Sequence, residues 1–141
     1  MESENRRTPE ASLKAVFLEA ASAFPEEGER AEVVGEALDF LQNGFDAHYE
    51  NSEGEAAGND DILVGDNDYA WAVETIARLD EPRFVAVAGR MIRDGAGRIS
   101  AGKSVSVESW TPHLAQLLDI VSGEGEKPSE ERIKKAAEVS S

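Results

Sequence analysis

The chain has 141 residues, no cysteine, and a formal net charge of −15 from 29 acidic and 14 basic side chains. This length fits one domain with a sizeable core, and the lack of cysteine excludes disulfides, thiolate metal sites and cysteine nucleophiles. The surplus of acid repels nucleic-acid phosphates and anionic lipid, so we expect no binding to nucleic acid.

Hydropathy and charge also bear on location. No apolar stretch approaches the ~18 residues of a membrane span, and the polar residues 1–10 lack the apolar region of a signal peptide. We therefore expect a cytoplasmic protein without membrane insertion. Its acid-rich, lysine-poor surface resembles the composition that high-salt cytoplasms favour.

Two helices are predicted after residues 1–9, which are charged and expected to be flexible. Thr8-Pro9 is a typical helix start, with Thr as the N-cap and Pro at the first helical position, and Pro25 ends that helix. Apolar residues recur every three to four positions, as on the buried face of a helix. They are Leu13, Val16, Phe17, Ala20 and Phe24 on the first helix, and Val34, Ala37, Leu38, Leu41, Phe45 and His48 or Tyr49 on the second.

A loop is predicted over residues 51–59, which contain two helix-disfavouring glycines and no large apolar residue. A third helix follows within residues 62–79, where Ile62–Asp66 forms a short apolar start. Its buried stripe consists of Tyr69, Ala72, Val73 and Ile76. Ala70 and Ala72 flank Trp71, and we expect one of these alanines to mark a close helix–helix contact with the indole filling space beside it.

The fourth segment admits two interpretations. Asp80 is the expected N-cap of a helix with Pro82 in its first turn, and this helix either ends near residues 94–97 or runs on to Gly102. Period 3.6 favours the helix, and the buried positions are then Phe84, Val87, Ala88, Met91 and Ile92. The alternative is a β-hairpin within residues 84–108, because residues 85–87 and 105–107 alternate as strands do.

Two further helices complete the predicted fold. Thr111-Pro112 is a second Thr-capped start, followed by a charged linker over residues 123–128 and a short terminal helix capped by Ser129. The apolar positions are Leu114, Leu117, Leu118 and Val121, then Ile133, Ala136 and Ala137. We predict an all-α antiparallel bundle of five or six helices, with a helical domain over residues 10–122 and the linker and terminal helix over 123–141.

Residues 62–79 (ILVGDNDYAWAVETIARL) resemble, without gaps, one helix of the polyprenyl synthetase (trans-prenyltransferase) superfamily. In that family a Leu-Ala-Gly-Asp-Tyr run opens a core helix that closes on Ala-x-Leu. The resemblance covers about residues 33–102. Since a full member is about twice as long, it implies an arrangement like half of a prenyl synthase fold.

The family binds a diphosphate through Mg²⁺ ions held between two aspartate-rich motifs, because hard oxygen ligands suit Mg²⁺. Asp60, Asp61 and Asp66 match the Asp-Asp-x4-Asp spacing of its first motif. Alignment on the family's Gly-Asp instead places that motif near Asp46 and Glu50, which lie four residues apart on one helix face. The two alignments exclude each other, and the second explains more residues. The simplest alternative is that these carboxylates are solvated.

The Arg-Arg-Gly and the second aspartate-rich motif of the family are missing, so no catalytic residue is predicted. The chain is similar in this to the non-catalytic small subunit of heterodimeric heptaprenyl diphosphate synthases. This resemblance implies a binding or regulatory subunit without a cofactor, packed against a protein partner or another copy.

Two other functions stay open. One is a Mg²⁺-dependent isoprenoid diphosphate-binding protein or prenyltransferase that uses Asp60, Asp61 and Asp66. The other is a salt-adapted helical domain of unrelated function. Trp71 and Trp110 are interpreted as core or interface anchors. His48 and His113 lie too far apart in the sequence to predict a shared metal site.

Overall fold

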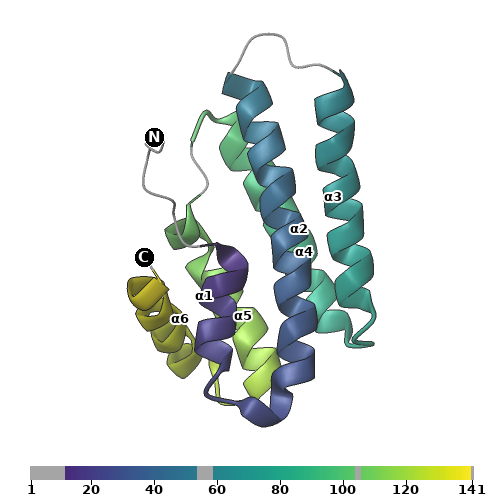
Figure 1. The fold of residues 1–141 in the computed structure, drawn as a ribbon. Helices are drawn as coiled ribbons and strands as arrows, with labels where there is room; N and C mark the ends of the chain where they lie inside the picture. The colour runs from purple at the N-terminus through teal and green to yellow at the C-terminus, as the bar shows by residue number, and fades with distance from the viewer. Residues whose placement is uncertain (1–11, 54–58, 104–105, 141) are drawn as a thin grey trace, which may run out of the picture.

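The structure, a computed structural model, describes residues 12–53, 59–103 and 106–140, and within them every side chain except those of 49–53, 59–65 and 140. In these ranges it contains six α-helices and no strand (Figure 1), which confirms the predicted all-α bundle. The helices are α1 (Leu13–Ala21), α2 (Gly28–Glu53), α3 (Asn59–Ala77), α4 (Pro82–Ser100), α5 (Thr111–Ser122) and α6 (Glu126–Ser140), with short 3-10 helices η1 (Pro25–Glu27) and η2 (Val107–Trp110).

Helices α2 and α3 form an antiparallel pair that packs along most of its length (Figure 1). Helix α4 lies against both of them, and α5 connects α4 to the small group formed with α1 and α6. The β-hairpin alternative is wrong, because α4 continues without a break from Pro82 to Ser100 and buries Ile99 near its end.

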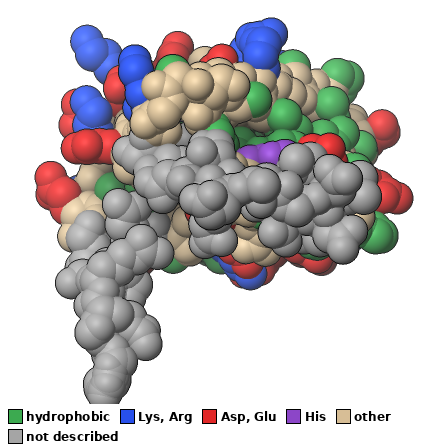
Figure 2. Space-filling view, turned by 90° about the horizontal axis from the view of Figure 1, so that it is seen from above, with side chains coloured by type: hydrophobic (Ala, Val, Ile, Leu, Met, Phe, Trp, Pro, Cys, Tyr) green, Lys and Arg blue, Asp and Glu red, His purple; other side chains and the backbone are tan. Residues whose placement is uncertain are grey.

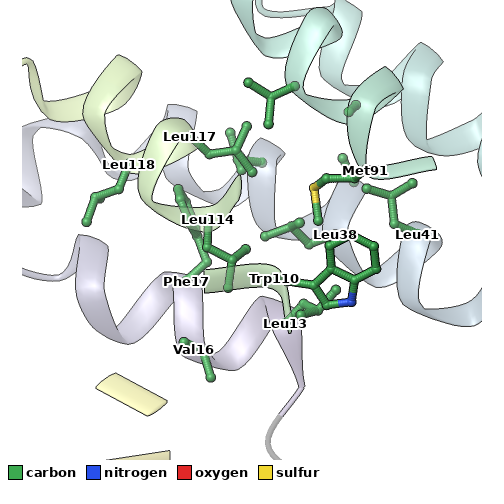
Figure 3. Packing of buried hydrophobic residues seen from close by; sticks show 14 of the residues in the cluster. Leu13, Val16, Phe17, Leu38, Leu41, Met91, Trp110, Leu114, Leu117 and Leu118 are labelled. Atoms are coloured by element: carbon green, nitrogen blue, oxygen red, sulfur yellow. The ribbon is translucent and has the colours of Figure 1, made fainter. Parts of the chain in front are cut away.

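The core is built from the predicted apolar stripes. Residues of α1, α2, α4, η2 and α5 meet in its centre (Figure 3). The predicted stripe residues that are fully buried include Val16, Phe17, Val34, Leu38, Leu41, Phe45, Ala72, Ile76, Phe84, Met91, Leu114, Leu118 and Ile133. Helix periodicity therefore identified the buried faces, since each helix turns one stripe towards its neighbours.

Several predicted helix starts are wrong. Ser12, not Thr8, caps α1, because Ser12 is extended and its Oγ accepts a hydrogen bond from the Ala15 amide at 2.9 Å. Thr8 and Pro9 lie outside the described residues. Helix α3 begins at Asn59, so Gly65-Asp66 lies inside the helix and not at its start. The predicted loop is helical at residues 51–53, and its residues 54–58 are not described.

The turn between α3 and α4 also differs from the prediction. Asp80 is left-handed (φ 57°) and reverses the chain, which Asp tolerates better than most residues. Glu81 therefore becomes the N-cap of α4, and its carboxylate accepts hydrogen bonds from the Arg83 amide at 3.2 Å and the Arg83 Nε at 3.0 Å. These bonds lower the pKa of Glu81 to about 2.

The last two helices begin earlier than predicted. Thr111 is itself helical because η2 leads directly into α5, so Trp110 occupies the cap position. Gly123 (φ 73°) ends α5, and its amide donates to the Asp119 carbonyl at 2.7 Å. Helix α6 starts at Glu126, which places Ser129 inside it, buried. Helix α6 packs on α1 and α5 through its apolar face.

The two alanines that flank Trp71, Ala70 and Ala72, lie in different environments. Ala72 is fully buried in the core, whereas Ala70 is exposed. The Trp71 indole, expected to fill space beside this contact, is 50% exposed and stacks on Phe40 of α2. Ala72 is therefore the small residue that permits close packing of α3.

The substitution Ala72→Leu is expected to destabilise the fold by about 1–3 kcal/mol, because a larger side chain overpacks a filled core. Ala70→Leu, the same change two residues away on the exposed face, is expected to change the free energy of unfolding by less than about 0.5 kcal/mol. Urea unfolding of both variants measures the difference. Equal effects would show that Ala72 is not a close contact.

Gly95 lies where α4 passes the ring of Phe45. A Cβ atom at Gly95 would lie 2.4 Å from Cε1 of Phe45, which is itself fully buried and stacked on Trp110. At Gly89, on the same helix, a Cβ atom would meet nothing within 4 Å. The two glycines therefore differ in packing while sharing the same helical backbone.

We expect Gly95→Ala to destabilise the protein by about 1–3 kcal/mol, since the buried ring has no free space to move into. Gly89→Ala is expected to stabilise it by roughly 0.5–1 kcal/mol, because alanine favours the helix. Thermal unfolding followed by circular dichroism compares them. A stabilising Gly95→Ala would contradict the close approach of α4 to Phe45.

Candidate functional site

The predicted acidic residues gather at one end of the bundle. Helix α2 ends and α3 begins at this end, so the last turns of α2 lie beside the first turns of α3 (Figure 1). Asp46 and Glu50 belong to α2, whereas Asp60, Asp61 and Asp66 belong to α3. The two alternative metal sites of the sequence thus occupy one region, although the side chains of Glu50, Asp60 and Asp61 are not described.

Asp66 contacts a histidine across the α2–α3 interface. Its Oδ1 lies 3.1 Å from Nε2 of His48, and the imidazole stacks on Tyr69 with ring centroids 5.2 Å apart. Figure 2, the view onto this end of the bundle, shows a histidine beside apolar and acidic side chains. Among the side chains that the structure describes, no three His, Asp or Glu residues gather as a metal site.

A row of aromatic rings continues from His48 through the bundle. Tyr69 packs on Phe45 at 5.5 Å, Phe45 stacks on Trp110 at 4.8 Å, and Trp110 meets His113 edge-on at 5.3 Å. His113 Nε2 in turn lies 2.9 Å from Oδ2 of Asp94. Five rings from α2, α3, η2 and α5 therefore join two His–Asp pairs. The 65-residue separation of the two histidines gave no indication of this arrangement.

Two polar groups of this row, the Tyr69 hydroxyl and His113 Nδ1, are affected by burial. Burial, followed by the charges of Asp66 and Asp68, raises the pKa of Tyr69, so its hydroxyl stays protonated at neutral pH. His113 Nδ1 is buried and has no hydrogen-bond partner among the described atoms.

Charge is unevenly distributed among the helices. Helices α2 and α3 together contain twelve Asp or Glu residues and one Arg, and thus carry −11 of the chain's net charge of −15. Helix α4 has the opposite character, with four Arg residues and one Asp. The bundle therefore has an acidic helix pair and a basic helix packed against it.

An aromatic pair is exposed on the acidic helices. The Trp71 indole stacks on Phe40 of α2 with ring centroids 6.3 Å apart and an interplanar angle of 25°. Glu36 lies one turn before Phe40, and Asp68 and Glu74 lie one turn before and after Trp71. We call these five residues the Trp71 surface. Within the described chain, Trp71 and Val139 are the only large apolar side chains that are exposed.

None of the helices described here has the length and apolarity that a membrane crossing requires. Comparison with known proteins found no matching family model, no similar curated protein and no similar solved structure. The resemblance to polyprenyl synthetases therefore stays a prediction that rests on the residues of 62–79 and their flanks.

Proposed function

We propose that the chain is a non-catalytic helical binding protein that docks a cationic, partly apolar protein segment on the Trp71 surface. The observation that carries this proposal is the half-exposed indole of Trp71, stacked on Phe40 and framed by carboxylates. Tryptophan is among the residues that most often dominate binding energy at interfaces. Its large apolar area gains most when a partner removes it from water.

The charge of the surrounding helices defines the partner. With −11 on α2 and α3, the surface attracts Lys and Arg side chains and repels acidic ones. A cation placed over the exposed indole also gains a cation–π contact. A basic amphipathic helix lying along α2 and α3 combines both requirements, with its apolar stripe on Trp71 and its cations on the flanking carboxylates.

The sequence resemblance supports the same class of function. Residues 62–79, which resemble a helix of the polyprenyl synthetase superfamily, contain Asp68, Trp71 and Glu74 of the Trp71 surface. The similarity of the chain to the non-catalytic subunit implies a role in packing against a protein partner. The proposal for this chain does not depend on the resemblance, because the exposed aromatic pair and the charge carry it independently.

A synthetic peptide helix with a leucine stripe and flanking arginines tests the proposal. We expect saturable binding in isothermal titration calorimetry, weakened about tenfold or more by Trp71→Ala, which corresponds to at least about 1.4 kcal/mol. Glu74→Lys should weaken binding similarly and reduce its dependence on salt. Glu138→Lys, which changes the net charge equally on α6, is the matched control.

Three outcomes contradict the proposal. Binding that is insensitive to Trp71→Ala moves the contact elsewhere, and equal effects of Glu74→Lys and Glu138→Lys reduce it to net charge. A dimer in light scattering that Trp71→Ala abolishes would assign the surface to a second copy of the chain instead of a cationic partner.

A further inference from the structure

The indole of Trp71 has one covered face and one open face. Phe40 of α2 stacks on it with ring centroids 6.3 Å apart and the two planes 25° from parallel. Trp71 is nevertheless 50% exposed, so Phe40 covers one face of the indole and the opposite face meets solvent. A ligand at the Trp71 surface therefore meets a flat aromatic face.

Helical geometry places Asp68 beside this open face. A side chain on a helix leans towards the amino end and covers the turn before its own Cα atom. The turn before Trp71 contains Asp68, which lies three residues earlier on the same side of α3. A group that stacks on the open face of the indole therefore comes next to the Asp68 carboxylate.

Asp68 has no cationic partner within the described chain. No Lys, Arg or His side chain there forms an ion pair with it. The side chain is half-buried, and this burial raises the pKa of its carboxyl group. Removing a carboxylate from water without pairing it costs free energy, and a cation bound beside it offsets that cost.

We infer that the Trp71 surface selects arginine over lysine in its partner, an inference that rests on the proposed function. The guanidinium group is planar, so it stacks on the indole of Trp71 while the N–H donors along its edge pair with the Asp68 carboxylate. The lysine ammonium is a compact and strongly hydrated charge without a flat face. It loses more hydration over the indole and makes no paired hydrogen bonds with Asp68.

The other two carboxylates of the Trp71 surface act differently. Glu36 and Glu74 are exposed, and charges in water attract any cation to a similar and modest extent. They therefore contribute to affinity for arginine and lysine alike. Asp68 is the residue that determines specificity, and Glu74, three residues after Trp71, is its comparison on the same helix.

Two peptides test the inference by isothermal titration calorimetry. One is the leucine-striped helix with flanking arginines, and the other has every arginine replaced by lysine. We expect the unsubstituted protein to bind the arginine peptide about tenfold or more tightly than the lysine peptide. Asp68→Asn should weaken the arginine peptide about tenfold and remove most of this preference, whereas Glu74→Gln should weaken both peptides equally.

Asp80→Asn is the matched control for Asp68→Asn. It makes the same change of charge in the turn after α3, and asparagine tolerates the left-handed conformation of residue 80 (φ 57°) as aspartate does. Trp71→Leu keeps an apolar side chain but removes the flat ring. It should therefore reduce the preference for arginine while the leucine stripe of either peptide still finds an apolar contact.

The outcomes separate this inference from the proposed function. If neither peptide binds, the proposed function and the inference both fall. Equal binding of the two peptides leaves the proposed function standing and overturns the selection of arginine alone. A preference that persists in Asp68→Asn, or that Asp80→Asn removes to the same extent, shows that Asp68 does not determine it.

Discussion

The packing of α2, α3, α4 and η2 against one another depends on the ring of Phe45. The ring projects from α2, packs on Tyr69 of α3, stacks on Trp110 before α5, and faces the bare backbone of Gly95 in α4. One ring therefore sets the distances of three neighbouring segments. Since Tyr69 and Trp110 also contact His48 and His113, the same ring fixes the positions of both His–Asp pairs.

The fold was largely predictable from the sequence, because burial on a helix follows the period of the backbone. Leu38, Leu41 and Phe45 fall on one stripe and are all buried. Helix starts were less predictable, since a cap depends on a backbone conformation that tertiary packing decides. Asp80 is of a residue type that favours the N-cap position. However, the reversal of the chain between α3 and α4 holds Asp80 in a left-handed conformation, so Glu81 is the N-cap of α4.

The candidate sites were less predictable, because their residues meet only through the register of packed helices. Asp66 was identified as a candidate ligand, but its partner His48 lies across an antiparallel helix pair. His113 of α5 likewise meets Asp94 of α4, and no spacing in the sequence encodes that meeting. Trp71 lies two residues after Tyr69 and points away from the stripe. The sequence was nevertheless interpreted as placing its indole beside a close helix contact, so its 50% exposure was not predicted.

The distribution of charge argues for binding over mere salt adaptation. Adaptation of composition to high salt favours acid over the whole surface, whereas here α6 contains four acidic and four basic residues, and α1 has one of each. The acid is concentrated on α2 and α3, where it frames the one exposed tryptophan of the described chain. Such concentration costs stability through like-charge repulsion, which the apolar stripe between the two helices must offset. The cationic partner proposed for the Trp71 surface would relieve that repulsion, because its charges are opposite in sign to those of α2 and α3.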